Sequence, residues 1–190
     1  MHLPNLLASL TLILLVSMVV LRVRLLRREG VAAMQFGKLD KTDFLIPPFA
    51  LFYFYLVFAQ TFDWPSPAHQ ELWRSKYPPW LGVLLCLVGL LLMIWSLVSF
   101  KTSFWVGIDT QQPGKLVTTG AFAFSRNPIY LAFTGMLLGQ FLVFPNPIML
   151  VYLLTAMGLF HRQVMREEEF LRKYYGQDFE TYCKKVHRYV

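Results

Sequence analysis

Charged residues are scarce in this sequence. Asp, Glu, Lys and Arg together make up 15% of the 190 residues, whereas a typical soluble domain carries about 25%. Hydrophobic residues account for 56%, and they form uninterrupted blocks that a chain of this length could not bury in a soluble core. The shortage of charge therefore excludes a soluble globular domain and predicts an integral membrane protein.

The sequence also has little that could hold a metal ion or a disulfide framework. Its two cysteines, Cys86 and Cys183, are too few for a framework and too far apart for a zinc knuckle. The histidines lack any ligand spacing, so we expect no metal site; they are His2, His69, His161 and His187. No Gly-rich nucleotide loop, zinc-hydrolase or serine-hydrolase signature occurs. A soluble-type nucleotide fold is therefore excluded.

Long apolar runs, in contrast, are abundant. A helix needs about 20 residues to cross the hydrocarbon core of a bilayer. Three runs are that long: Leu3 to Leu21, Phe44 to Phe62 and Trp80 to Phe100. We expect Pro47 and Pro48 to kink the second helix. Basic residues follow the first run instead of preceding it, which predicts a retained helix and not a cleaved signal peptide.

Two shorter apolar runs follow, Ile129 to Phe144 and Ile148 to Phe160. The Pro145-Asn146-Pro147 turn between them predicts a tight helical hairpin. Its second helix can continue past His161 into the acidic run at 167–169. These two runs bring the expected number of membrane-spanning helices to five.

Gly135 and Gly139 lie in the first hairpin helix with the spacing that lets two helices approach closely. We expect this pair to pack the hairpin internally. The sequence as a whole predicts an all-α integral membrane protein with five transmembrane helices, the last two forming a hairpin, and a cytoplasmic C-terminal helical segment.

The distribution of basic residues predicts the orientation. Every Lys and Arg except Arg74 and Lys76 falls in the segments 22–41, 101–126 and 162–188. Cytoplasmic loops collect basic residues, so five spans place the N-terminus outside and the C-terminus in the cytoplasm. Membrane anchoring accounts for the net charge of +7, which excludes nucleic-acid binding as the main activity. The small size favours a prokaryotic plasma membrane.

A polar, aromatic-rich segment from Lys115 to Tyr130 precedes the hairpin. As an ordinary loop, it would place Arg126 at the lipid head groups and start a helix at Pro128. A polar loop directly before a short hairpin is also suited to lining a water-filled cavity. Composition alone leaves both interpretations open.

The acidic run begins a second polar segment, from Glu167 to Tyr182. Glu168 and Glu169 each precede a basic residue by four positions, Arg172 and Lys173 respectively, which is the favourable orientation for ion pairs along a helix. Glu167 has no cation three or four positions away in either direction. We therefore expect Glu167 to contact a cationic ligand.

These two segments resemble the integral-membrane methyltransferases of the isoprenylcysteine carboxyl methyltransferase and phospholipid N-methyltransferase group. The resemblance covers roughly the C-terminal half, and its order and spacing agree with the predicted hairpin. The residues that carry it are Leu116-Val117, Gly120-Ala121-Phe122, Arg126-Asn127-Pro128-Ile129-Tyr130, Glu167-Glu168, Tyr175-Gly176-Gln177-Asp178-Phe179-Glu180-Thr181-Tyr182 and Arg188.

The resemblance implies a membrane methyltransferase that takes S-adenosylmethionine as cofactor and a lipid-like acceptor from the membrane. It implies one domain over residues 1–190, with three transmembrane helices in 1–100 and the cofactor-binding loop, hairpin and C-terminal segment in 101–190. The implied cofactor-binding residues are Lys115, Leu116, Val117, Gly120, Phe122, Arg126, Asn127, Pro128, Tyr130, Glu167 and Glu168. The implied substrate-binding residues are Gln163, Arg162 and Arg188. Methyl transfer mainly needs alignment and exclusion of water, so no catalytic residue is assigned.

Three positions depart from the family pattern. Phe122 stands where a Tyr is common, and Asn127 stands where a His is usual, although Asn can still donate and accept hydrogen bonds. Gln163 replaces an Arg that grips the substrate carboxylate in carboxyl methyltransferases. A carboxylate, an amine or a thiol is therefore open as the methyl acceptor. An NADPH-dependent membrane reductase and a non-enzymatic membrane scaffold are the alternative functions.

Overall fold

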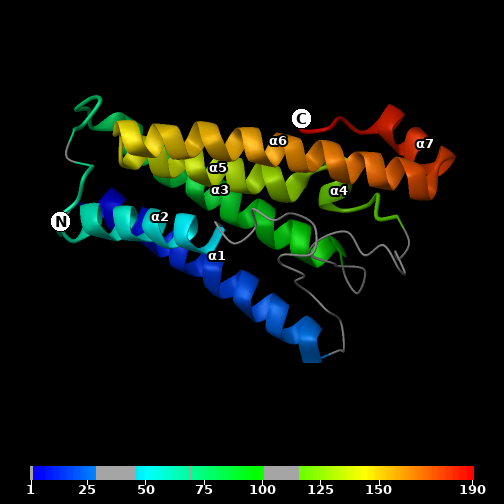
Figure 1. Ribbon diagram of the computed structural model, residues 1–190, viewed down its shortest axis with the longest axis horizontal. Helices are drawn as coiled ribbons and strands as arrows, with labels where there is room; N and C mark the ends of the chain where they lie inside the picture. The colour runs from blue at the N-terminus through cyan, green and yellow to red at the C-terminus, as the bar shows by residue number, and fades with distance from the viewer. Residues whose placement is uncertain (1, 29–45, 69, 101–115) are drawn as a thin grey trace.

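The computed structural model describes residues 2–28, 46–68, 70–100 and 116–190, and all regular structure in these ranges is helical (Figure 1). The prediction of an all-α protein is confirmed. Figure 1 shows α3, α5 and α6 side by side, with α7 folding back at the far end of α6. In chain order the helices are α1 (Leu3–Arg28), α2 (Ile46–Thr61), α3 (Tyr77–Phe100), α4 (Ala121–Phe124), α5 (Pro128–Val143), α6 (Pro147–Tyr175) and α7 (Gln177–Lys185).

Three of these helices are long and apolar enough to cross a membrane. The candidate spans are Leu3–Leu25, Tyr77–Ser99 and Pro147–Tyr175. The apolar helices α2 and α5 have 16 residues each. That corresponds to about 24 Å of helix, less than the hydrocarbon thickness of about 30 Å. Length and composition therefore support three spans, and the arrangement of five stays a prediction.

The start of α2 differs from the sequence prediction. The helix begins at Ile46, so Pro47 and Pro48 lie in its first turn. The N–H groups of a first turn have no partner within the helix, and proline, which lacks an N–H, is well suited to that position. The expected kink at these prolines is thus a helix start. Phe44, the predicted first residue, lies outside the described ranges.

A seam of small residues packs α5 against α3. A Cβ atom on Gly82 would lie 2.5 Å from the carbonyl oxygen of Gly139, and the reverse holds as well. A Cβ atom on Gly89 of α3 would lie 2.6 Å from Cγ of Met136 on α5. A Cβ on Gly135 would meet nothing within 4 Å. The expected use of the Gly135 and Gly139 pair inside the hairpin is wrong, because α5 turns its close-packed face toward α3 and not toward α6.

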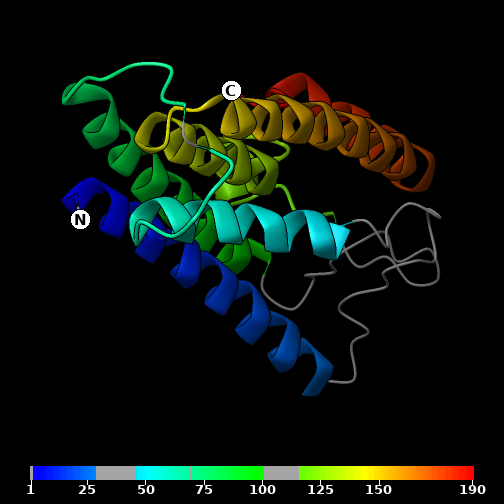
Figure 2. The same ribbon diagram turned by 60° about the vertical axis from the view of Figure 1, so that its left-hand side comes forward.

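Buried polar side chains connect α1 to its neighbours. The hydroxyl oxygens of Ser9 and Thr61 lie 2.7 Å apart and join α1 to α2. Gln140 of α5 donates through Nε2 to the carbonyl of Ala8 at 2.7 Å. In an apolar environment such hydrogen bonds orient helices that dispersion contacts alone leave free to rotate. Figure 2 shows α1 and α2 adjacent along one side of the bundle.

The predicted hairpin around Pro145 is confirmed, because α5 and α6 are separated only by this turn. Asn146 caps α6 by accepting a hydrogen bond from the Met149 N–H at 3.0 Å. Its amide nitrogen donates to Gln60 Oε1 of α2 at 2.9 Å. α6 then runs through the acidic segment to Tyr175, as expected. The hairpin therefore carries its acidic residues well beyond its apolar half.

Candidate functional site

Glu168 of α6 is the centre of a buried ionic network. Its side chain is 3% exposed and faces Arg126, which is 11% exposed and lies 3.2 Å away from Nε to Oε1. Arg188 reaches the other carboxylate oxygen through Nη2 at 3.0 Å. Asn127 donates from Nδ2 to Oε1 at 3.1 Å. The two sequence segments that carry the family resemblance therefore meet at one carboxylate.

Backbone carbonyls of the C-terminal tail also hold the Arg126 segment. The Arg126 N–H donates to the carbonyl of His187 at 3.0 Å. Its guanidinium Nη1 donates to the carbonyls of Cys183 and Val186, both at 3.2 Å. Arg188 contributes its own carbonyl, which accepts from the Asn127 side chain at 3.2 Å. The tail is thus a structural partner of the loop that precedes α5.

Tyr182 of α7 holds the same loop from a second direction. Its hydroxyl donates to the carbonyl of Phe122 at 2.6 Å, and both residues are buried. Burial raises the pKa of Tyr182 above its ordinary value, because the ionised phenolate would lose its solvation, and the charge of Arg126 offsets this only in part. The hydroxyl therefore remains a donor at neutral pH and fixes α4 against α7.

The ion pairs of the second segment differ in one respect from the sequence prediction. Glu169 and Lys173 do pair along α6, at 2.6 Å. Glu168 does not pair with Arg172, which instead contacts Glu180 of α7 at 2.5 Å. The reason is burial: Glu168 faces the interior, where only side chains from other elements reach it, whereas the guanidinium of Arg172 is on the exposed face of the helix.

Gly120 has a local structural role at the start of α4. Its φ angle is 65°, in the left-handed region that favours glycine. A Cβ at this position would collide with the hydroxyl oxygen of Ser99, which accepts a hydrogen bond from the Ala121 N–H at 2.9 Å. Ser99 thereby anchors the loop to the end of α3. Ser99 cannot be singled out from the sequence, since nothing near it in the chain marks it as a partner of the loop.

Glu167 lies one position before Glu168 on α6, but its environment is different. Tyr130 of α5 donates its hydroxyl to Glu167 Oε1 at 2.6 Å, and Gln163 donates to the same oxygen at 3.0 Å. Both donors are neutral. Over the described ranges no ion pair forms at Glu167 and no hydrogen bond reaches its Oε2. A half-buried carboxylate with one free oxygen is suited to bind an added cation or donor.

Aromatic rings of α6 and of the C-terminal tail lie along the same end of the hairpin. The ring of Tyr130 lies 5.7 Å from that of Phe160, centroid to centroid. Further along the chain, Tyr189 of the tail meets His161 with 2.9 Å between the hydroxyl and Nδ1. His161 is exposed. Tyr189 was missed because a tail residue carries no periodic signal that would place it on α6.

The other residues named from the resemblance take several positions. Leu116 and Val117 are half-buried, and Pro128 is buried at the first position of α5. Arg162 is exposed on α6, and Lys115 lies outside the described residues. The structure thus brings most of the predicted cofactor-binding set to one end of α5 and α6, and it places Arg188 on the Glu168 network.

Comparison with known proteins identifies one family. The family model described as phospholipid methyltransferase matches residues 78–178. A probable protein-S-isoprenylcysteine O-methyltransferase of Oryza sativa subsp. indica is 28% identical over 124 residues, covering 64% of this chain and 63% of the relative. The protein-S-isoprenylcysteine O-methyltransferase of Schizosaccharomyces pombe is 35% identical over 77 residues, covering 37% of this chain and 30% of the relative.

A third relative, from an insect, matches a share of this chain similar to that of the Oryza sativa relative. The protein-S-isoprenylcysteine O-methyltransferase of Tribolium castaneum is 25% identical over 132 residues, covering 68% of this chain and 45% of the relative. The chain therefore spans less than two thirds of the length of these relatives. No solved structure matches the chain with comparable significance. The matched range 78–178 includes Arg126, Tyr130 and both carboxylates at 167–168, whereas Arg188 lies beyond it.

Proposed function

The chain belongs to the phospholipid methyltransferase family, and from this membership we propose that it transfers the methyl group of S-adenosylmethionine to a lipid-like acceptor at the membrane. The observation that carries the proposal is the contact between Tyr130 and Glu167, which joins the two family segments at one end of the hairpin. The two alternative functions, an NADPH-dependent reductase and a scaffold without activity, have no support from the family match.

The side chains at this end fit the charge of the cofactor. S-adenosylmethionine carries a sulfonium and an ammonium group, both positive. Glu167 keeps one carboxylate oxygen without a hydrogen bond among the described side chains, and its two neighbours there are neutral donors. A carboxylate in this state gains most from a cationic partner. We therefore assign the ammonium contact to Glu167, with Leu116, Val117 and Phe122 supplying apolar contacts.

Glu168 has a different role in this proposal. Its oxygens already accept from Arg126, Asn127 and Arg188, which leaves it little capacity for a ligand. We assign Glu168, Arg126 and Asn127 to positioning: their contacts fix the turn before α5 and thereby the place of Tyr130 relative to Glu167. The resemblance alone placed Arg126, Asn127 and Glu168 among the direct cofactor contacts.

The reaction needs few chemical groups from the protein. The cofactor supplies an electrophilic methyl group on a positively charged sulfur. The residues of this chain align donor and acceptor, and the surrounding apolar helices exclude water. Tyr130 donates its hydroxyl to Glu167 and so holds the carboxylate in place. No covalent intermediate with the protein is required.

The curated relatives are named isoprenylcysteine O-methyltransferases, so an S-prenylated cysteine carboxylate is the first acceptor to test. One observation favours a second candidate. Gln163 is neutral and donates to Glu167 at 3.0 Å, so it offers no charge to hold a substrate carboxylate. Neutral lipid-like amines or thiols are therefore the second class of acceptor. Arg162 and Arg188 remain the proposed substrate contacts if a carboxylate is used.

We further propose the five-span topology with the N-terminus outside and the C-terminus in the cytoplasm. It would place Glu167 and the basic tail at the cytoplasmic face, where S-adenosylmethionine is made available. Single cysteines introduced at Ser75 and at Thr181, both exposed, in a chain whose native Cys86 and Cys183 are replaced by serine, test it by labelling with a membrane-impermeant reagent on intact cells. Labelling at Ser75 alone is expected, and labelling at Thr181 alone would reverse the orientation. The prokaryotic plasma membrane stays a prediction.

The first experiment is calorimetric titration of the detergent-purified full chain with S-adenosylhomocysteine and, separately, with NADPH. We expect binding of the former only. Binding of NADPH alone would replace methyl transfer by a reductase function, and binding of neither by folded protein would favour the scaffold. A labelled methyl donor offered with prenylcysteine, amine and thiol acceptors then identifies the acceptor class.

A further inference from the structure

A cavity lies at the other end of the helical bundle, away from Glu167. It has a volume of about 950 Å³ and is bordered by the α5–α6 turn at Phe144 and Pro145. Glu168 is 21 residues beyond Pro147 on α6, which corresponds to about 30 Å along the helix axis. This distance equals about one hydrocarbon thickness. The cavity is therefore separate from the Glu167 site and lies near the opposite membrane interface.

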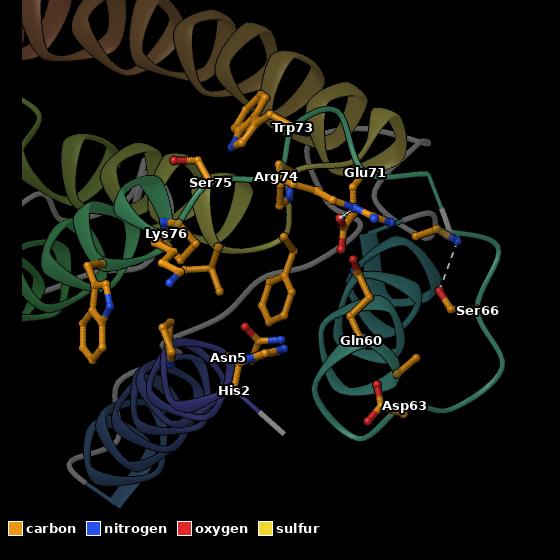
Figure 3. Close-up of a pocket in the computed structure, with 18 of the residues that line it drawn as sticks. His2, Asn5, Gln60, Asp63, Ser66, Glu71, Trp73, Arg74, Ser75 and Lys76 are labelled. Atoms are coloured by element: carbon orange, nitrogen blue, oxygen red, sulfur yellow. Dashed lines mark hydrogen bonds and ion pairs between the residues drawn. The ribbon is translucent and has the colours of Figure 1, made fainter.

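The walls of this cavity have opposite polarity. Lys76 lines it directly before α3 begins, and Asp63 lines it shortly after α2 ends. A helix N-terminus carries partial positive charge and a C-terminus partial negative charge, so each helix end reinforces the side chain beside it. Figure 3 shows Lys76 and Asp63 on opposite sides of the cavity. The arrangement matches a ligand that has a negative and a positive group.

The charges on these walls are available to a ligand. Neither Lys76 nor Asp63 has an ion-pair partner within the described part of the chain. Arg74, also on the cavity wall, pairs with Glu71 at 2.8 Å, but their side chains are 89% and 53% exposed. A pair this exposed contributes little stability, and it can yield its guanidinium to a stronger anion such as a phosphate.

Aromatic side chains complete the site. Trp64 follows Asp63 directly and also lines the cavity. A carboxylate next to an indole ring is a favourable environment for an alkylammonium group. Trp80 lines the opposite side at the start of α3 and is half exposed, in keeping with the tryptophans that gather at membrane interfaces. Beyond Trp80, the exposed apolar face of α3 continues with Leu84.

From these walls we infer that the cavity binds the head group of a zwitterionic phospholipid, with the phosphate toward Lys76 and the amine toward Asp63. The acyl chains lie along the exposed apolar face of α3 next to Trp80. This lipid is bound at the interface opposite to the methyl-transfer site, so it is not the methyl acceptor. The inference does not depend on the proposed function, because it uses none of the residues assigned to it.

The test is native mass spectrometry of the detergent-purified full chain titrated with phosphatidylethanolamine, phosphatidylcholine, phosphatidylglycerol and diacylglycerol. We expect the two zwitterionic lipids to bind about tenfold more tightly than the other two, because only their head groups carry a cationic nitrogen that can lie against Asp63 and Trp64. Glycerophosphoethanolamine, a soluble head group without acyl chains, is expected to displace the bound lipid. Equal binding of phosphatidylglycerol, or failure of the soluble head group to compete, overturns the inference.

Two variants test the contributions of Lys76 and Asp63 to lipid binding separately. Lys76→Gln is expected to weaken all phospholipids about tenfold. Asp63→Asn is expected to weaken only the two zwitterionic lipids, whose head groups carry a cationic nitrogen, and asparagine tolerates the positive φ of 55° at this position. The matched controls Lys184→Gln and Asp178→Asn remove the same charges on exposed positions of α7 and are expected to change nothing. If neither cavity variant differs from its control, the inference is wrong; the displacement assay on the unaltered chain decides if a variant fails to fold.

Discussion

Arg126 and Glu168 lie 42 residues apart in the chain and form an ion pair of 3.2 Å that is almost inaccessible to solvent. Removing one partner of a buried pair leaves an uncompensated charge, which is more damaging than the pair itself is stabilising. Arg188 and Asn127 contact the same carboxylate, so two distant segments, the turn at 126–127 and the C-terminal tail, depend on one side chain of α6.

Glu168→Gln is therefore expected to lower the free energy of unfolding by about 3 kcal/mol. The measurement is the midpoint of thermal unfolding in detergent, followed by circular dichroism. Glu169→Gln is the control, because its pair with Lys173 is exposed and is worth less than about 1 kcal/mol. Equal midpoints for the two variants would contradict the assignment of Glu168 as the centre of a stabilising ionic network.

Glu167→Gln is expected to act on ligand binding instead of on stability. Loss of the carboxylate should weaken S-adenosylhomocysteine about tenfold to a hundredfold, since a charged contact to the ligand ammonium is lost. Tyr130→Phe, which removes the donor 2.6 Å from Glu167, should weaken it by a smaller factor. Calorimetric titration measures both. Unchanged affinity in Glu167→Gln would refute this residue as the ammonium contact.

The α3–α5 seam predicts different effects for two glycines of the same helix. Gly139→Val should be severely destabilising, because its Cβ would meet the Gly82 carbonyl oxygen at 2.5 Å and helices in a packed bundle cannot separate without opening voids. Gly135→Ala should be neutral or slightly stabilising, since its Cβ enters open space and alanine favours helix. Yield of folded protein after detergent extraction distinguishes them. Equal loss in both variants would contradict the seam.

We expect ionisation of the buried Tyr182 hydroxyl to destabilise the protein at alkaline pH. Because burial raises the pKa of Tyr182 in the folded chain, the folded state retains its proton above pH 10 while the unfolded state loses it. The stabilisation is complete below the ordinary pKa of tyrosine and falls as the pH rises above it. Tyr182→Phe should remove about 1 kcal/mol at neutral pH and should show a flatter decline of Tm between pH 9 and about pH 11. A parallel decline in both proteins would show that Tyr182 does not contribute.

Much of the helical layout follows from the sequence alone, because it depends on local properties. An uninterrupted apolar run must form a helix in a membrane, and the prolines around Asn146 can only end one helix and begin the next. The lack of a cation three or four positions from Glu167 was also visible in the spacing of residues along one helix. These features involve neighbours within a few positions, so no knowledge of the fold was needed to predict them.

The tertiary structure decided what depends on distant partners. Glu168 had an adequate cation four residues away, yet it pairs with Arg126 and Arg188, since its side of α6 is covered by other elements. Gly139 was expected to pack against the other helix of its own hairpin, yet it packs on Gly82 of α3. In both cases the sequence suggested a partner nearby in the chain, and burial against a different element determined the real one.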